Sequence, residues 1–234
     1  MQPMSESIDD RVHSLRFLMS AGLMSVPVRC DETLAQRVVI VPGQPVRLER
    51  VSLPLKRRQQ REKALPYALE EGLADSLEQT HFALGTGPGG DDDLAAIVSR
   101  AQMAAWVDTI EQAGLSHCMI VPETLLVPYS EGQVGWTVIE RGESVLVRRG
   151  DGTGFAVERV QFSSLHTAAG KPEIHAMGTD QLRLDRADLI DLTQGDFTVS
   201  TGGTARLFQL AAMVAVGFLA VQTLIAMVDL WALG

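Results

Sequence analysis

The segment GDGTG, residues 150–154, comes nearest in this sequence to a phosphate-binding loop. A Walker loop needs the pattern G-x-x-x-x-G-K-[ST] at the start of a helix, with the lysine reaching the phosphates. No such lysine is present here, and the flanking residues have a strand-like pattern. The other glycine-rich segment, TGPGGDDD at residues 86–93, ends in three acids that would repel phosphate. We therefore expect a β-hairpin turn at residues 150–154 and no nucleotide loop at either place.

Histidines, cysteines and acids show no spacing that would assemble a reactive site. The five histidines occur singly (His13, His81, His117, His166 and His175). The sequence contains neither a metal-binding HExxH or H-x-H pattern nor a G-x-S-x-G nucleophile motif. Cys30 and Cys118 lack CxxC spacing, so we expect reduced, partly buried thiols. These observations predict no enzymatic activity, no metal and no cofactor.

The composition narrows the class of protein further. The chain has 234 residues and a formal net charge of -9, with 7 Phe, 3 Trp and 2 Tyr. An acidic balance without an aromatic-rich basic patch argues against a nucleic-acid-binding protein. About 200 residues precede the last apolar stretch, which is enough chain to bury a core, and their content of Val, Leu and Ala suits a mixed α/β domain.

The last apolar stretch, residues 207–228, predicts a transmembrane helix. No charged side chain lies between Arg206 and Asp229, and these 22 residues would extend roughly 33 Å as a helix, enough for a hydrocarbon core of about 30 Å. Acids near the start of the chain argue against a signal peptide, so we expect a cytoplasmic N-terminus, in agreement with Arg206 before the helix. The small residues Ala211 and Ala215 are candidates for packing against another helix.

The first half of the polar part contains both strand and helix patterns. Residues 12–19 could form a strand, whereas residues 22–33 have no usable periodicity. Residues 37–41 and 46–53 predict a hairpin-style strand pair around the turn PGQP, and a change of apolar phase predicts a bulge near residues 49–50. Leucines recur at helical spacing from Leu65 to Leu77. Because Pro66 lies within this pattern, either the helix begins near residue 64 or a longer helix kinks there.

The second half predicts alternating elements. We expect strands at 81–85, 94–99 and 117–122, with a helix at 102–113. The strands at 94–99 and 117–122, with the helix between them, predict a parallel unit with a crossover helix. Residues 123–128 predict a turn or a single helical turn. Residues 134–160 predict three antiparallel strands, followed by a short helix at 162–170 and a strand at 173–178.

The segment ALPYALEEGLADSLEQTHFALG, residues 64–85, resembles the LPYLLEE-type segment of the type II secretion system protein L family. The neighbouring segments agree in order: a VVIVPG-like strand before this segment, and VPETLLVP at residues 121–128 after it. IDLTQGDF at residues 190–197 is similar to the family's "NLLQGxF", which precedes its single membrane helix. The resemblance covers roughly residues 36–234.

The resemblance implies an α/β, actin-like (ribonuclease-H-related) cytoplasmic domain followed by a single transmembrane helix. The expected boundaries are a domain at 1–197, a linker at 198–206, a transmembrane helix at 207–229 and a short periplasmic end at 230–234. The family normally continues into a small periplasmic domain, and this chain stops at Gly234.

The same resemblance implies an inner-membrane scaffold that recruits the cytoplasmic secretion ATPase (protein E) through the ATPase's N-terminal domain. It also implies contact with platform proteins M and F and a homodimer. The candidate partner-contacting residues are the charged side chains around the 64–85 segment: Arg57, Arg58, Arg61, Glu70, Glu71, Asp75 and Glu78. A solvated helix face is the alternative for these charges. The alternative functions are a membrane-anchored enzyme of the actin/sugar-kinase type that binds nucleotide, and an adaptor like the type IV pilus protein M.

Overall fold

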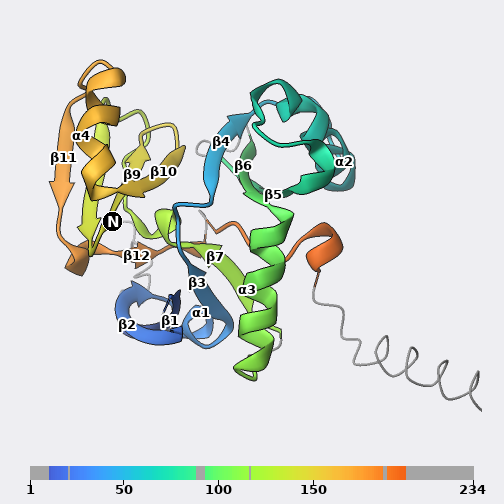
Figure 1. Cartoon of the computed structure of the whole chain (residues 1–234), viewed down its shortest axis with the longest axis horizontal. Coiled ribbons are helices and arrows are strands. Elements are labelled where there is room, and N and C mark those ends of the chain that lie inside the picture. The colour runs from blue at the N-terminus through green and yellow to red at the C-terminus, as the bar shows by residue number, and fades with distance from the viewer. Residues whose placement is uncertain (1–10, 21, 88–92, 116, 187–188, 199–234) are drawn as a thin grey trace, which may run out of the picture. The chain divides into compact units, whose positions relative to one another are not determined.

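The computed structural model describes residues 11–198 except 21, 88–92, 116 and 187–188 (Figure 1). The chain divides into two units, residues 1–198 and 199–234, and all described residues belong to the first. The predicted transmembrane helix with Ala211 and Ala215, the periplasmic end and the linker beyond residue 198 lie outside the described residues. Within the described part, no helix is both long and apolar enough to cross a membrane.

Two mixed sheets form the described unit, which confirms the predicted α/β class. The first has five strands in the order β12-β2-β1-β3-β7. β1 and β2 are antiparallel, whereas β3 runs parallel to β1 and to β7. The strand bounds are β1 Val12–Met19, β2 Gly22–Cys30, β3 Val38–Val41, β7 Met119–Pro122 and β12 Arg183–Leu184, and helix α1, Glu32–Arg37, follows β2.

The second sheet has seven strands in the order β11-β8-β9-β10-β4-β6-β5. β8, β9 and β10 are the antiparallel trio expected from residues 134–160. The strands are β11 Ile174–Met177, β8 Trp136–Arg141, β9 Ser144–Arg149, β10 Gly154–Glu158, β4 Arg47–Val51, β6 Asp93–Ser99 and β5 Thr80–Thr86. The helices are α2 Arg58–Leu69, α3 Arg100–Gln112 and α4 Arg159–Ala168; short 3-10 turns include η1 Glu70–Gly72, η2 Leu77–Gln79, η3 Glu123–Leu126, η4 Thr179–Gln181 and η6 Gly195–Phe197.

The predicted hairpin of residues 37–53 is wrong. β3 lies in the five-stranded sheet between β1 and β7, whereas β4 lies in the seven-stranded sheet between β10 and β6. All four residues of β3 are buried, as expected of a central strand covered on both faces. Gly43, in the connection, lies so close to Thr124 that a Cβ atom would meet its hydroxyl oxygen at 2.3 Å. Because β3 and β4 lie in different sheets, the turn that contains Gly43 carries the chain from one sheet to the other.

The predicted bulge at residues 49–50 is also wrong. β4 keeps an unbroken register with β6 from Arg47 to Val51. Leu48 belongs to the main hydrophobic cluster, whereas Val51 packs in a second cluster with Leu65 of α2. Since both faces of β4 are covered by apolar side chains, the change of apolar phase marks two cores rather than an extra residue.

The predicted parallel unit at residues 94–122 has the right elements but the wrong pairing. β6 belongs to the seven-stranded sheet and β7 to the five-stranded sheet, so α3 joins two sheets. Its buried side chains, Met103, Trp106 and Ile110, all enter the main cluster. α2 begins at Arg58, contains Pro66 and ends at Leu69, so the helix starts earlier than residue 64. The helical spacing predicted as far as Leu77 is wrong, because Leu77 begins the separate 3-10 turn η2.

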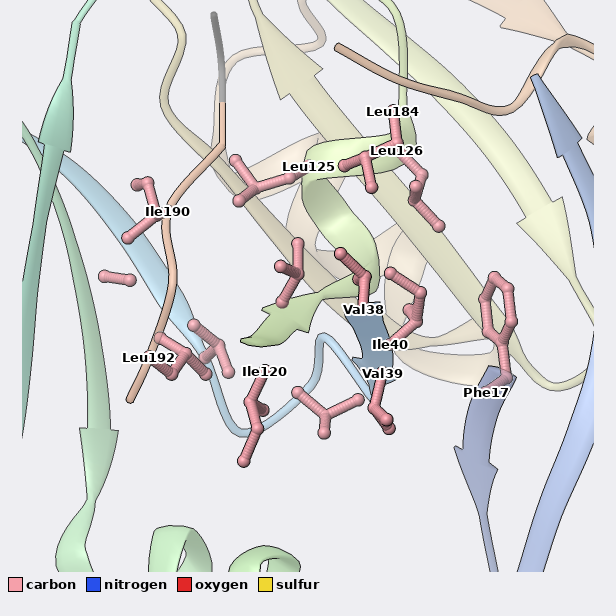
Figure 2. Close-up of a cluster of buried hydrophobic side chains, with 14 of the residues drawn as sticks. Phe17, Val38, Val39, Ile40, Ile120, Leu125, Leu126, Leu184, Ile190 and Leu192 are labelled. Atoms are coloured by element: carbon pink, nitrogen blue, oxygen red, sulfur yellow. The ribbon is translucent and has the colours of Figure 1, made fainter. Parts of the chain in front are cut away.

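The main cluster brings together segments from the whole described chain. Figure 2 shows Phe17 of β1, Val38 to Ile40 of β3, and Ile120 of β7 beside Leu125 and Leu126 of η3. Ile190 and Leu192, near the end of the described residues, lie in the same cluster. The segment that contains Ile190 and Leu192 is therefore part of the core.

Candidate partner interface and its anchoring segment

Residues 190–197, with the sequence IDLTQGDF, form what we call the anchoring segment. Ile190 and Leu192 are 1% and 0% exposed. A Cβ atom on Gly85 of β5 would lie 2.4 Å from Cγ1 of Ile190, so only glycine allows this close approach. The apolar residues of the segment thus hold it against the sheets.

The anchoring segment covers the edge strand of the five-stranded sheet. β7 is the last strand in that sheet, and the N–H of Ile120 donates to Oδ1 of Asp191 at 3.1 Å. The N–H of Leu192 donates to the carbonyl of Ile120 at 2.8 Å. Both backbone polar groups of Ile120 are therefore satisfied without another strand. An edge strand whose polar groups are satisfied in this way is protected from pairing with a second chain.

The same segment covers the edge strand of the seven-stranded sheet. Oε1 of Gln194 accepts from the N–H of Leu84 in β5 at 3.0 Å, and its Nε2 donates to the carbonyl of Leu84 at 3.1 Å. Nε2 also donates to the carbonyl of Asp191 at 2.8 Å, which holds the amide in place. One short segment therefore joins the edges of both sheets.

His81 of β5 also contacts the anchoring segment, at Leu192 and Phe197. Its Nε2 lies 2.7 Å from the carbonyl of Leu192, and because a carbonyl only accepts, Nε2 carries the proton. Burial is the main cause that lowers the pKa of His81, so the folded protein holds the ring neutral. The Phe197 ring contacts it edge-on with centroids 4.9 Å apart. Asp196 adds an ion pair with Arg100 at 2.6 Å.

Two further segments that carry the family resemblance, the VVIVPG-like strand with its turn and residues 121–128, also contact each other. In the turn after β3, the N–H of Gly43 donates to Oε1 of Glu123 at 3.0 Å. Oε2 of Glu123 pairs with Nη1 of Arg141 in β8 at 2.7 Å, and the carboxylate is almost fully buried. Sequence reasoning did not single out Glu123 or Arg141, because no local pattern shows that an acid 80 residues away will meet this turn.

The candidate partner-contacting residues separate into two kinds. Arg58 donates to Glu62 at 2.8 Å and to the carbonyl of Leu84 at 3.0 Å. Arg61 pairs with the buried carboxylate of Asp93. These two arginines therefore stabilise the packing of α2 on β5 and β6, together with the buried leucines of the helix.

The remaining candidates are exposed, as Arg58 is, and lie at both ends of α2. Arg57 immediately precedes the helix. The exposed acids follow its end, in or between η1 and η2: Glu70, Glu71, Asp75 and Glu78. The 12-residue helix spans roughly 18 Å, so the basic and acidic charges do not form one cluster. Between them Tyr67, which sequence reasoning missed, is 71% exposed; a tyrosine in a mostly polar helix was the available signal.

The glycine-rich segment at residues 150–154 forms the predicted turn, here between β9 and β10. Oδ1 of Asp151 accepts from both the N–H and the hydroxyl of Thr153, at 2.9 and 2.6 Å. Across the described residues, no group of three or more His, Cys, Asp or Glu side chains could hold a metal ion. Cys30 and Cys118 are free thiols, as predicted; burial, with Asp31, raises the pKa of Cys30 to about 11, so this thiol stays protonated.

Comparisons with known proteins agree with this arrangement. The model of the family "Type II secretion system (T2SS), protein L" matches residues 12–205, so the match begins earlier than the resemblance at residue 36 suggested. The type II secretion system protein L of Klebsiella pneumoniae is 37% identical over 137 residues, covering 57% of this chain and 34% of that protein. Its counterpart in Dickeya chrysanthemi is 30% identical over 148 residues, covering 63% of this chain and 36% of that protein.

A solved structure shares the fold. The cytoplasmic domain of EpsL, an inner-membrane component of the type II secretion system of Vibrio cholerae, is 21% identical with a TM-score of 0.51. The similarity covers 82% of this chain and 96% of that domain. The matches to the curated relatives span only about a third of their length.

Proposed function

The chain belongs to the type II secretion system protein L family, and from this premise we propose that it is an inner-membrane scaffold that holds the cytoplasmic secretion ATPase at the assembly platform. The relatives are named as components of a secretion system and not as enzymes. In this proposal the described unit lies in the cytoplasm and residues 207–229 cross the membrane.

The anchoring segment is the observation that carries the proposal. A scaffold that transmits force needs a firm connection between its partner-binding domain and its membrane segment. Ile190 and Leu192 are buried, while Asp191 and Gln194 hydrogen-bond to the edge strands of both sheets. Because the segment immediately precedes the predicted linker, a pull on the linker would act on both sheets together.

The exposed side of α2 is the proposed contact for the N-terminal domain of the ATPase. Tyr67 offers a large amphipathic ring, the kind of side chain that contributes strongly to protein interfaces. Arg57 at one end of the helix, and Glu70 and Glu71 at the other, supply charges that can set the orientation of the partner. Arg58 and Arg61 hold the helix against the sheet, through Leu84 and Asp93.

Further partners follow from family membership and belong to the same proposal. The membrane segment, with Ala211 and Ala215, would contact platform proteins M and F, and the chain would form a homodimer. A pilus-type adaptor is the less favoured alternative, because that system divides the cytoplasmic and membrane parts between two chains.

The experiment that tests the proposal is calorimetric titration of the full chain, purified in mild detergent, in two arms. The N-terminal domain of the secretion ATPase should bind with a Kd of roughly 10 μM or tighter. Magnesium-ATP, in the second arm, should give no heat of binding. Magnesium-dependent binding of ATP at micromolar concentration would instead favour the enzyme of the actin/sugar-kinase type, and no ATPase complex at tens of micromolar would overturn the proposal.

A further inference from the structure

Each of the two sheets has two terminal strands, and three of these four edges are protected. The anchoring segment covers β7 at Ile120 and β5 at Leu84. β12 is only two residues long, and its Arg183 pairs with Asp185 at 3.0 Å; short length and charge both keep an edge from pairing with another chain. The fourth terminal strand, β11, has four residues with no proline, lysine, arginine or acid among them. Figure 1 shows it at the outer margin of its sheet.

The backbone of β11 presents four polar groups at its outer edge. β11 runs parallel to β8, and the carbonyl of Glu173, just before β11, accepts from the N–H of Trp136 in β8 at 2.8 Å. Because the polar groups of successive residues in a strand point to opposite sides, Ile174 and Ala176 direct theirs away from β8. Within the described residues, no strand pairs with this side of β11. The open groups are therefore the N–H and the carbonyl of Ile174 and of Ala176.

The open part of this edge is bounded on both sides. Pro172 has no N–H, and its carbonyl accepts from Nε2 of His166 at 2.8 Å. The carbonyl of Gly178 accepts from the N–H of Gln181 at 3.1 Å. The carbonyls at the next outward positions are thus already used within the chain, so the edge offers one short pairing window centred on His175.

Apolar side chains accompany this window. The register of β11 with β8 sets Ile174 beside Trp136 and Ala176 beside Val138, on the same face of the sheet. Trp136 and Val138 belong to the third buried cluster, whereas Ile174 is 39% exposed and Ala176 is exposed. A further strand beside β11 would cover these two side chains and extend the cluster.

The window is complementary to itself under two-fold symmetry. An axis at His175 sets Ile174 opposite Ala176 of a second, antiparallel copy, and all four open groups of each copy then form hydrogen bonds with the other. We propose that two copies of this chain associate through β11, which joins their seven-stranded sheets into one. The inference rests on the homodimer of the proposed function and assigns its contact.

The predicted membrane helices make a small contact sufficient. Four paired residues in each copy bury less surface than a stable dimer of free chains needs, which is about 1,200–2,000 Å². Tethered modules, however, meet at effective concentrations of the order of mM, so weak pairing is populated between copies held in one membrane.

Disulfide cross-linking of the full chain in mild detergent tests this register. In a Cys118→Ser background, which leaves only the buried thiol of Cys30, His175→Cys places two cysteines across the axis. Facing residues of such a non-hydrogen-bonded pair have Cα atoms about 4.5 Å apart, a distance that a disulfide spans. Ile174→Cys is the matched control, because its two copies lie diagonally, roughly 7–8 Å apart. Oxidation should give at least about fivefold more covalent dimer with His175→Cys than with Ile174→Cys.

A proline substitution tests the hydrogen bonds. Adding Ala176→Pro should abolish the His175→Cys cross-link, because proline lacks the N–H that faces the second copy. The Tm should stay close to that of the parent chain, since the bonds of β11 to β8 do not use this N–H. Ser25→Pro in β2 is the control and should leave the cross-link intact; Arg29 of the same strand donates its N–H outward to the carbonyl of Leu182, and Ser25 faces the same side.

Light scattering on the same samples separates this inference from the proposed function. Dimers in which His175→Cys cross-links no better than Ile174→Cys would overturn pairing through β11 and leave the homodimer in place. A cross-link that survives Ala176→Pro would do the same. A monomeric wild-type chain would overturn both the pairing and the homodimer, whereas the ATPase titration would still decide the tethering role.

Discussion

The side-chain amide of Gln194 forms hydrogen bonds with both the N–H and the carbonyl of Leu84, a residue 110 positions earlier in the chain. A neighbouring strand would normally satisfy these two backbone groups. Here one side chain does so at the edge of the seven-stranded sheet, while Asp191 and Leu192 satisfy Ile120 at the edge of the other sheet. The connection toward the predicted membrane helix is thereby built into the fold.

Replacing Gln194 by alanine should lower the free energy of unfolding by about 1–3 kcal/mol, because the polar groups of Leu84 lose their partner. Hydrogen exchange of the Leu84 amide should become faster, whereas a core strand such as β3 should change little. Gln60→Ala, at an exposed position of α2, is the control and should alter stability by less than about 0.5 kcal/mol. Equal exchange in both variants would argue against the edge-covering role of Gln194.

Glu123→Ala should destabilise the described unit by about 3 kcal/mol, because it leaves Arg141 without its carboxylate and removes the acceptor for Gly43. Urea denaturation followed by tryptophan fluorescence measures the change. The control is Glu140→Ala, whose partner Arg159 is half-exposed, and it should cost about 0.5 kcal/mol or less. A similar cost for the two variants would contradict a structural role for the buried carboxylate.

Acidification should weaken the attachment of the anchoring segment through His81. The unfolded chain takes up a proton with a pKa near 6.5, whereas burial lowers the pKa of His81 in the folded state. Below about pH 6.5 the unfolded state therefore binds more protons, and the stability contributed by the neutral ring is lost as the pH falls.

The variant His81→Gln keeps an amide donor for Leu192 but cannot titrate. The difference in Tm between the wild-type chain and this variant should shrink from pH 7.5 to pH 5.5. His175→Gln, which replaces a half-buried histidine outside the anchoring segment, should show no comparable change. A constant difference for His81→Gln would mean that protonation of His81 is not linked to folding.

Tyr67→Ala should weaken binding of the ATPase's N-terminal domain by at least about tenfold, the size of effect typical of a central interface residue. Because Tyr67 is exposed, the Tm should be unchanged. Met24→Ala in β2 removes another exposed apolar side chain and should leave binding unaffected. If both variants bind like the wild-type chain, the proposed contact on α2 is wrong.

Local sequence patterns predicted most elements but not their assembly. A run of apolar residues located β6, and strand-like patterns located β5 and the trio β8 to β10. The leucine spacing located the second half of α2 but continued past its end at Leu69, since Leu73 and Leu77 lie outside the helix. The pairing of β3 with β1 and β7 depends on residues up to about 80 positions apart, which no local period reveals. β2 and α1 were missed because the first residues of β2, Gly22 to Ser25, do not alternate and the alternation from Val26 to Cys30 is short and contains Pro27. The available signal for α1 was Asp31, which caps the helix by accepting from the N–H of Thr33.

The candidate site was predictable only in part, for the same physical reason. Proximity in the sequence grouped Arg58 and Arg61 with the other charges, whereas in the fold both contact the sheet, Arg58 at Leu84 and Arg61 at Asp93. The roles of Gln194 and Glu123 depend on tertiary contacts with Leu84 and Gly43. The motif segments were recognisable by resemblance, but their pairing required the structure.

Flotation of the secretion ATPase with lipid vesicles tests the proposed scaffold role most directly. The full chain is reconstituted into vesicles, the ATPase is added, and the vesicles are separated on a density gradient. We expect the ATPase to float only when the chain is present, and to remain at the bottom with the Tyr67→Ala chain. ATPase that stays at the bottom in the presence of the reconstituted wild-type chain would contradict the proposed tethering function.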